Sequence, residues 1–173
     1  MNITDFENLL SGGDLRSIGH SNEVVLKIGS QEEFDRLIAL LFHENRLVAM
    51  RAADIVEKVT IDHPLWLNKH KGAILQLCQR VQHKELQWHL AQLLPRLTLN
   101  QQELLQVWEL LLSWTKNKKQ SRIVRVFSLQ SLYDLLPVLP DQKQNFSKLI
   151  TELQEEQIPS LNARIKKLSK MLK

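Results

Sequence analysis

The feature that most constrains the fold of this chain is an apolar pattern that returns at a constant interval. Residues 48–59 read VAMRAADIVEKV, and the same spacing returns 38 residues later in 86–97 and again in 124–135. With the first residue of each segment numbered zero, positions 0, 4, 8 and 11 share one face of a helix. The residues at these positions are Val48, Ala52, Val56, Val59, Leu86, Leu90, Leu94, Leu97, Val124, Ser128, Leu132 and Leu135. A fourth copy, 37 residues on, keeps Leu161, Ile165 and Leu172, so we predict a stack of repeated helical units.

Another helical segment precedes each copy, so we expect the chain to form helical hairpins. Capping signals mark several helix starts: Ser30, Asn100 with Glu103 three residues on, and Pro159 in a first turn. No segment alternates with a period of two, so we expect no strand. We therefore predict an all-α protein, an α-α superhelix (solenoid) of about four hairpins in one domain over residues 1–173. Its expected parts are an irregular N-terminal cap over 1–30 and hairpins over 31–60, 70–97, 101–135 and 141–173.

The repeated segments resemble those of a known family. The segments VAMRAADIVEKV, VRVFSLQSLYDL and LNARIKKLSKML resemble the second helices of HEAT repeats, which are ARM-type α-solenoid modules, and the resemblance covers residues 31–173. Arg125 matches the arginine that commonly follows the first apolar position of that helix, whereas Ala49, Gln87 and Asn162 depart from it. The resemblance implies that hairpins stack side by side and that second helices line one surface, usually the inner curve.

Composition and charge limit the classes of protein to which the chain can belong. With 43% hydrophobic and 24% charged residues, the composition is that of an ordinary globular protein. Residues 1–60 carry six basic and ten acidic side chains, whereas 116–173 carry twelve and five, so a polyanion could prefer the C-terminal part. The one cysteine, Cys78, cannot form an internal disulfide, so we expect a reducing compartment, the cytoplasm. The longest aliphatic or aromatic run, LIALLF, is far shorter than a membrane span, and no membrane partner is expected.

Equivalent positions of the second helices predict a ladder of side chains that could dock a protein or peptide. The candidate docking residues are Arg51, Asp54, Trp88, His89, Arg125, Tyr133 and Arg164. A structural role is the alternative for several of them. Asp54 could pair locally with Lys58 and Arg51, Arg164 could pair with an acid of the preceding helix, and Trp88 could belong to the core. For Trp66, Trp108 and Trp114 we expect core positions.

The most concentrated charge lies in the segment KNKKQSRIVR, which joins two expected helices. Lys118, Lys119, Arg122 and Arg125, together with backbone donors at a helix start, could bind a phosphate or another anion. The alternative is an ordinary solvated turn.

No motif in the sequence indicates catalysis. The six histidines have no metal-ligand spacing, the glycines form no phosphate loop, and Cys78 has no evident histidine partner. We expect no metal and no cofactor. The predicted function is a non-catalytic scaffold, monomeric or weakly dimeric, that binds a protein or peptide, with nucleic-acid binding as the alternative. A remote third reading is a DNA-alkylation-repair glycosylase, to which Trp88, Asp54 and the basic end give a faint similarity.

Overall fold

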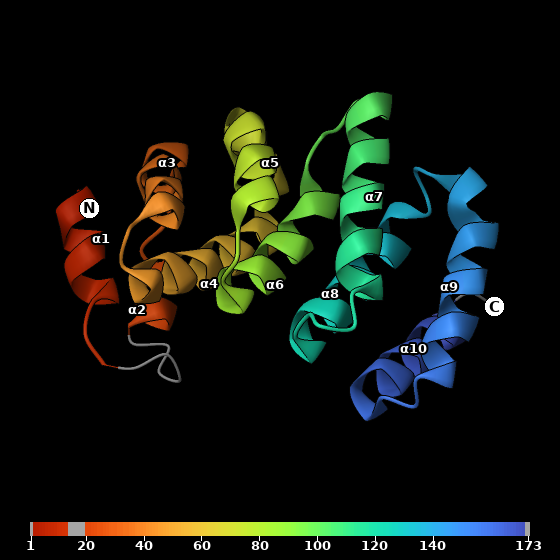
Figure 1. Cartoon of the computed structure of the whole chain (residues 1–173). Helices are drawn as coiled ribbons and strands as arrows, with labels where there is room; N and C mark the ends of the chain where they lie inside the picture. The colour runs from red at the N-terminus through yellow and green to blue at the C-terminus, as the bar shows by residue number, and fades with distance from the viewer. Residues whose placement is uncertain (1, 14–19, 172–173) are drawn as a thin grey trace. The chain divides into compact units, whose positions relative to one another are not determined.

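The computed structural model describes residues 2–13 and 20–171 of the chain, and Figure 1 shows its arrangement of helices. Helices account for all the regular secondary structure of these residues, which contain no strand. The all-α prediction is therefore confirmed. The chain divides into two compact units, Met1–Thr98 and Leu99–Lys173, which are described separately below as the first and second units.

The first unit contains six α-helices and three short 3-10 helices within its described residues. They are α1 (Ile3–Leu10), α2 (Ser21–Val25), α3 (Gln31–Ala39), η1 (Leu40–Phe42), α4 (Arg46–Asp62), η2 (Pro64–His70), α5 (Lys71–Arg80), α6 (Lys84–Leu93) and η3 (Leu94–Arg96). The pairs α3–α4 and α5–α6 are the two hairpins expected over 31–60 and 70–97. The second helices of these hairpins, α4 and α6, pack against each other.

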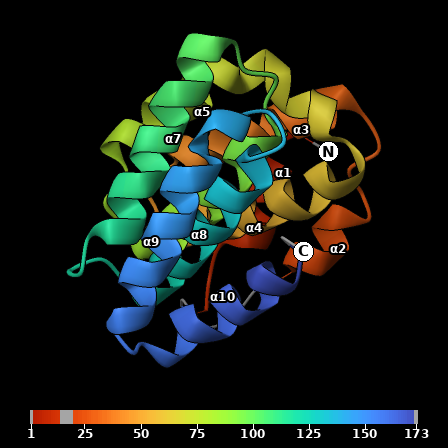
Figure 2. The ribbon, with the colours of Figure 1, turned by 90° about the vertical axis from the view of Figure 1, so that its right-hand side faces the viewer.

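The second unit contains the other two predicted hairpins. Its elements are α7 (Gln101–Lys116), α8 (Arg122–Leu135), η4 (Pro140–Gln142), α9 (Lys143–Glu155) and α10 (Pro159–Met171). Here too the second helices, α8 and α10, are in contact. Figure 2 shows the sharp turn between α9 and α10. In this turn Gln157 has a backbone φ of 52°, which residues other than glycine rarely adopt.

The repeated apolar pattern forms the cores of both units. All twelve side chains at the four equivalent positions are buried, the most exposed being Leu86 and Leu97 at 7%. They lie in α4, α6 and α8, except that Leu94 belongs to η3 and Leu97 follows it. Leu161 and Ile165 are buried in the fourth copy, while Leu172 lies outside the described residues. Ser128, the polar member, is fully buried, and its hydroxyl has no hydrogen-bond partner within the described part of the chain. The constant spacing thus identified the core-facing stripe of each second helix correctly.

The N-terminal segment is more regular than we expected. Residues 1–30 were predicted to be irregular, yet they contain α1 and α2, and both pack on α4. The side chains of Asn2 and Asp5 cap the first turn of α1 reciprocally. Phe6 and Leu10, four residues apart, turn toward the core and are completely buried. The prediction missed α1 because eight residues are too few for a helical period to stand out.

The predicted helix starts and buried aromatic residues agree with the structure, with one partial exception. Ser30 accepts a hydrogen bond at the start of α3, Asn100 and Glu103 form the capping box of α7, and Pro159 opens α10. Trp108 and Trp114 are core residues, 1% and 8% exposed. Trp66 is only half-buried, and its ring stacks on the imidazole of His63 with centroids 4.2 Å apart.

Cys78 lies on the buried side of α5. Its side chain is 2% exposed and forms no disulfide. Burial raises the pKa of the Cys78 thiol to about 12, because the thiolate would lose its hydration. A protonated, inaccessible thiol is chemically inert, as the apolar sequence around it indicated.

Candidate functional site

Arg51, the first of the predicted docking residues, does not face a partner. It is 1% exposed, and its Nη1 atom donates to the backbone oxygens of Leu10, Ser11 and Gly12 at 2.8, 3.2 and 2.7 Å. These carbonyls lie at the C-terminal end of α1, where no backbone N–H of the helix donates to them. Arg51 therefore anchors the end of α1 to α4.

His89 on α6 is also buried, at 2% exposure. Its Nδ1 lies 3.2 Å from the carboxylate of Glu57 on α4, to which Gln92 also donates at 3.2 Å. Burial by itself would raise the pKa of Glu57, but the hydrogen bond and charge of His89 and the charge of Arg96 outweigh it and lower that pKa. The prediction that His89 docks a partner conflicts with this burial. The residue instead joins two neighbouring second helices.

Arg125, the residue that matches the HEAT arginine, is a buried structural side chain of the second unit. It is 1% exposed, its Nε donates to the carbonyl of Thr115 at 2.7 Å, and its two terminal nitrogens each lie 2.8 Å from an oxygen of Glu156. The hydrogen bonds from Arg125 lower the pKa of the Glu156 carboxyl and keep it ionised. Arg125 therefore contributes neither to the docking ladder nor to the anion site, because its guanidinium is buried and donates to groups inside the second unit.

The geometry of an α-helix explains why Arg51 and His89 are buried. Position 3 of a second helix lies roughly a quarter turn from the centre of the apolar stripe. This flank faces an element earlier in the chain: the end of α1 for α4, α4 for α6, and α8 for α10. Arg51, His89 and Arg164 occupy this flank. Positions 2, 6 and 9 point further from the core, and their residues in the described second helices are mostly half-buried or exposed.

Four predicted docking residues keep part of their surface accessible. Asp54 pairs with Lys58 at 2.7 Å, the local ion pair that was one of its two expected roles. Trp88 is half-buried, and the centroid of its ring lies 3.5 Å from the ring centroid of His89. In the second unit, half-buried Tyr133 lies 6.1 Å from Phe146, measured between ring centroids. Arg164 donates to Gln130 at 2.6 Å and lies over the ring of Phe127, so its partner is an amide and not the expected acid.

The basic turn before α8 keeps three of its four predicted cations in solvent. Lys118, Lys119 and Arg122 are exposed. Ser121 caps α8, its hydroxyl accepting a hydrogen bond from the backbone of Val124. Without Arg125, the predicted anion site is an open surface turn.

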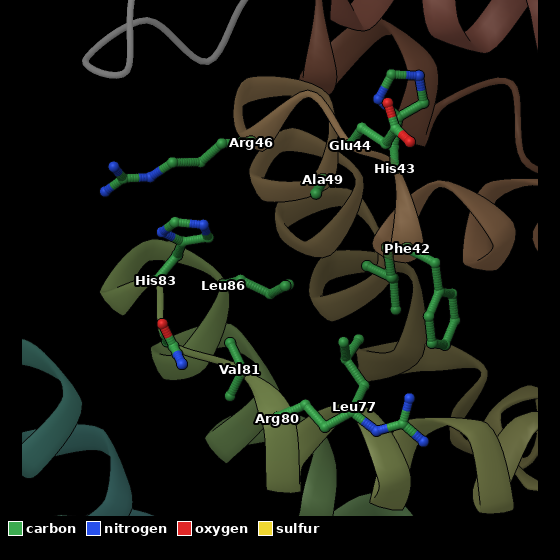
Figure 3. A pocket seen from close by; sticks show the side chains of 12 residues that line it. Phe42, His43, Glu44, Arg46, Ala49, Leu77, Arg80, Val81, His83 and Leu86 are labelled. Atoms are coloured by element: carbon green, nitrogen blue, oxygen red, sulfur yellow. The ribbon is translucent and has the colours of Figure 1, made fainter.

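A cavity of about 360 Å³ lies in the first unit, between the turn that precedes α4 and the turn that precedes α6 (Figure 3). Its lining residues are Leu41, Phe42, His43, Glu44, Arg46, Ala49, Leu77, Arg80, Val81, Gln82, His83 and Leu86. We did not predict this cavity from the sequence. Its walls come from two segments about 38 residues apart, so the repeat interval that placed the helices could also have placed these two turns together.

No α-helix within residues 2–13 and 20–171 combines the length and the apolar character that crossing a bilayer requires. The described residues also contain no cluster of three or more His, Cys, Asp or Glu side chains that could hold a metal ion.

Comparison with known proteins agrees with the arrangement of paired helices. A family model described as a HEAT repeat domain matches residues 8–172, nearly the whole chain. No curated protein and no solved structure matched the chain. The repeated hairpins, the buried stripes at a fixed interval and the extent of the match lead to one conclusion: the chain belongs to the HEAT repeat family.

Proposed function

We propose that this protein is a non-catalytic, cytoplasmic scaffold that docks a segment of another protein on the second-helix face of the first unit. We use this name for Met50 and Asp54 on α4 and for Trp88 and Gln92 on α6, all half-buried. HEAT repeats generally serve as protein-interaction scaffolds, and the family is typically non-catalytic. The proposal assigns this chain to that general role and names the face.

The observation that carries the proposal is the partial exposure of Trp88 on this face. A tryptophan whose edge remains accessible among polar groups offers a large, rigid contact area with little loss of side-chain entropy. Asp54 and Gln92 lie at equivalent positions of neighbouring second helices, so they can supply the polar contacts beside it. Arg51, His89 and Arg125 are left out because they are buried.

Replacing Trp88 with alanine tests this proposal. We expect a partner captured by the immobilised wild-type chain, identified by mass spectrometry and then purified, to bind the variant at least tenfold more weakly, because interface tryptophans commonly contribute about 2 kcal/mol. Isothermal titration calorimetry measures the loss. The circular dichroism of the variant should stay helical.

A matched control is Leu105→Ala, which truncates a side chain on α7 that is 42% exposed. It should leave the affinity unchanged. If Trp88→Ala instead unfolds the first unit while Leu105→Ala does not, Trp88 is a packing residue and the second-helix face loses its anchor.

The basic turn carries a weaker alternative, the binding of nucleic acid or another polyanion. Lys118, Lys119 and Arg122 are three exposed cations within five residues. If all three contact phosphates, the logarithm of the affinity for a DNA duplex should fall with the logarithm of salt concentration at a slope of about −2.7. Exchange of all three for glutamate should abolish the binding. A gel shift without any complex at low salt would eliminate this alternative.

A further inference from the structure

The cavity between the two turns of the first unit has an apolar interior. Leu41, Ala49 and Leu86 are 1%, 5% and 7% exposed, and half-buried Leu77 and Val81 complete the lining between the turns (Figure 3). Its volume of about 360 Å³ lies within the range of pockets that accept small ligands. An aliphatic or aromatic side chain inserted among these apolar residues gains the free energy of burial.

The rim of the cavity carries more basic than acidic side chains. Arg46, Arg80, His43 and His83 line it, and Glu44 is the one carboxylate among the lining residues. In Figure 3 Arg46 and His83 border one edge, and Glu44 lies at another. A bulky apolar side chain, Phe42, also stands at the rim and is 49% exposed.

Two of the basic rim side chains already have partners within this chain. The guanidinium of Arg46 pairs with Glu85 on α6. The imidazole of His43 lies 3.0 Å from the carboxylate of Glu7 on α1. Arg80, at the end of α5, is different: it is exposed, and among the described residues its guanidinium forms no hydrogen bond or ion pair. The positive charge of Arg80, beside the apolar recess, can therefore pair with a group from outside the described chain.

We propose that this cavity binds a short peptide segment of a partner protein in which a bulky apolar side chain stands next to an aspartate or glutamate. The apolar side chain enters between Leu77 and Leu86, and the neighbouring carboxylate pairs with Arg80. A guanidinium can donate two parallel hydrogen bonds to a carboxylate, which fixes the direction of the segment across the rim. Half-exposed Phe42 covers the inserted side chain from the other side.

This site is separate from the second-helix face, because no residue of that face lines the cavity. The two proposals can therefore fail independently. Trp88→Ala should leave the peptide affinity of the cavity unchanged, and substitutions in the cavity should leave docking at Trp88 unchanged.

Four fluorescein-labelled twelve-residue peptides test the proposal with the full-length chain. They are identical except at the centre, where leucine is flanked by two glutamates, two glutamines or two lysines, or alanine is flanked by two glutamates. Fluorescence anisotropy should rank the leucine peptide with glutamates first. The alanine and the lysine peptides should each bind at least tenfold more weakly, and the glutamine peptide should fall between them and the first.

Two variants separate the charge from the cavity. Arg80→Glu should reverse the ranking, so that the lysine-flanked leucine peptide binds best, which a general loss of affinity could not produce. Ala49→Leu fills the recess and should weaken every leucine peptide at least tenfold without lowering the thermal midpoint. Arg122→Glu makes the same charge change in the second unit and should leave the ranking as in the wild type.

Three results of the peptide experiments would overturn the proposal. The first is the lack of saturable binding by the leucine peptide with glutamates at millimolar concentration. The second is equal binding of all four peptides, and the third is a ranking that Arg80→Glu leaves unchanged. Sedimentation of the protein alone at the same concentrations checks the other occupant, a second copy of the chain. A dimer that Ala49→Leu abolishes would assign the cavity to self-association and also overturn the peptide proposal.

Discussion

Replacing Arg125 with alanine lowers the free energy of unfolding of the second unit by about 3 kcal/mol or more. The substitution removes three hydrogen bonds, to Thr115 and to both oxygens of Glu156, and leaves a largely buried carboxylate without its cation. Because the chain has two compact units, the measurement should report on the second one alone. Hydrogen exchange of peptides from α8 and α9, followed by mass spectrometry, does so.

Two comparisons make this test specific. Arg122→Ala, three residues earlier and exposed, should change the stability by less than about 0.5 kcal/mol. The pH dependence reports the same ion pair. In the folded state Arg125 lowers the pKa of Glu156 below its usual 4.5. The ion pair therefore contributes its full stabilisation of the folded state above that pH. This contribution is lost as the pH falls through the pKa of Glu156 in the folded state. Glu156→Gln should therefore flatten the acid limb of the stability curve. Unchanged protection of α8 in Arg125→Ala would refute the structural role.

Replacing Arg51 with alanine detaches α1 from the first unit. The three carbonyls of Leu10, Ser11 and Gly12 lose their shared donor, at an expected cost of about 2 to 3 kcal/mol. Phe6 and Leu10 still favour docking through their buried side chains, so we expect local opening and not global unfolding. Amide protection across Ile3–Leu10 should fall by more than tenfold, while α6 should keep its own.

Arg80→Ala is the control for this prediction, since Arg80 is an exposed arginine of the same unit. It should leave the exchange of α1 unchanged. If α1 exchanges at the wild-type rate in Arg51→Ala, the carbonyl contacts contribute nothing measurable and the packing of Phe6 and Leu10 holds the helix.

The second helices could be predicted from the sequence because their signal is repeated. A single amphipathic stripe is weak evidence for a particular fold, but a stripe that returns every 38 residues indicates a repeated unit. All twelve residues of the repeated stripe are buried. Ser128 shows that the interval is more informative than residue type, since a polar side chain at a core position is as fully buried as Ala52 and Leu90.

The candidate site was less predictable, for two physical reasons. The same helical geometry that defines the stripe also places position 3 on a helix flank, but whether a flank meets solvent or a neighbouring helix depends on packing between repeats. Arg51 and His89 meet neighbours, so their polarity reflects buried hydrogen bonds and not exposure. The cavity depends on how far apart two turns stand, a distance that no residue pattern encodes.

The inertness of Cys78 has a practical consequence. Because the thiol is buried and its pKa is about 12, the thiolate that reacts with iodoacetamide is scarce at neutral pH until α5 opens to solvent. The rate of alkylation therefore times the opening of the first unit. Since the sequence contains no second cysteine, Cys78 of the wild-type chain reports this opening without an engineered label.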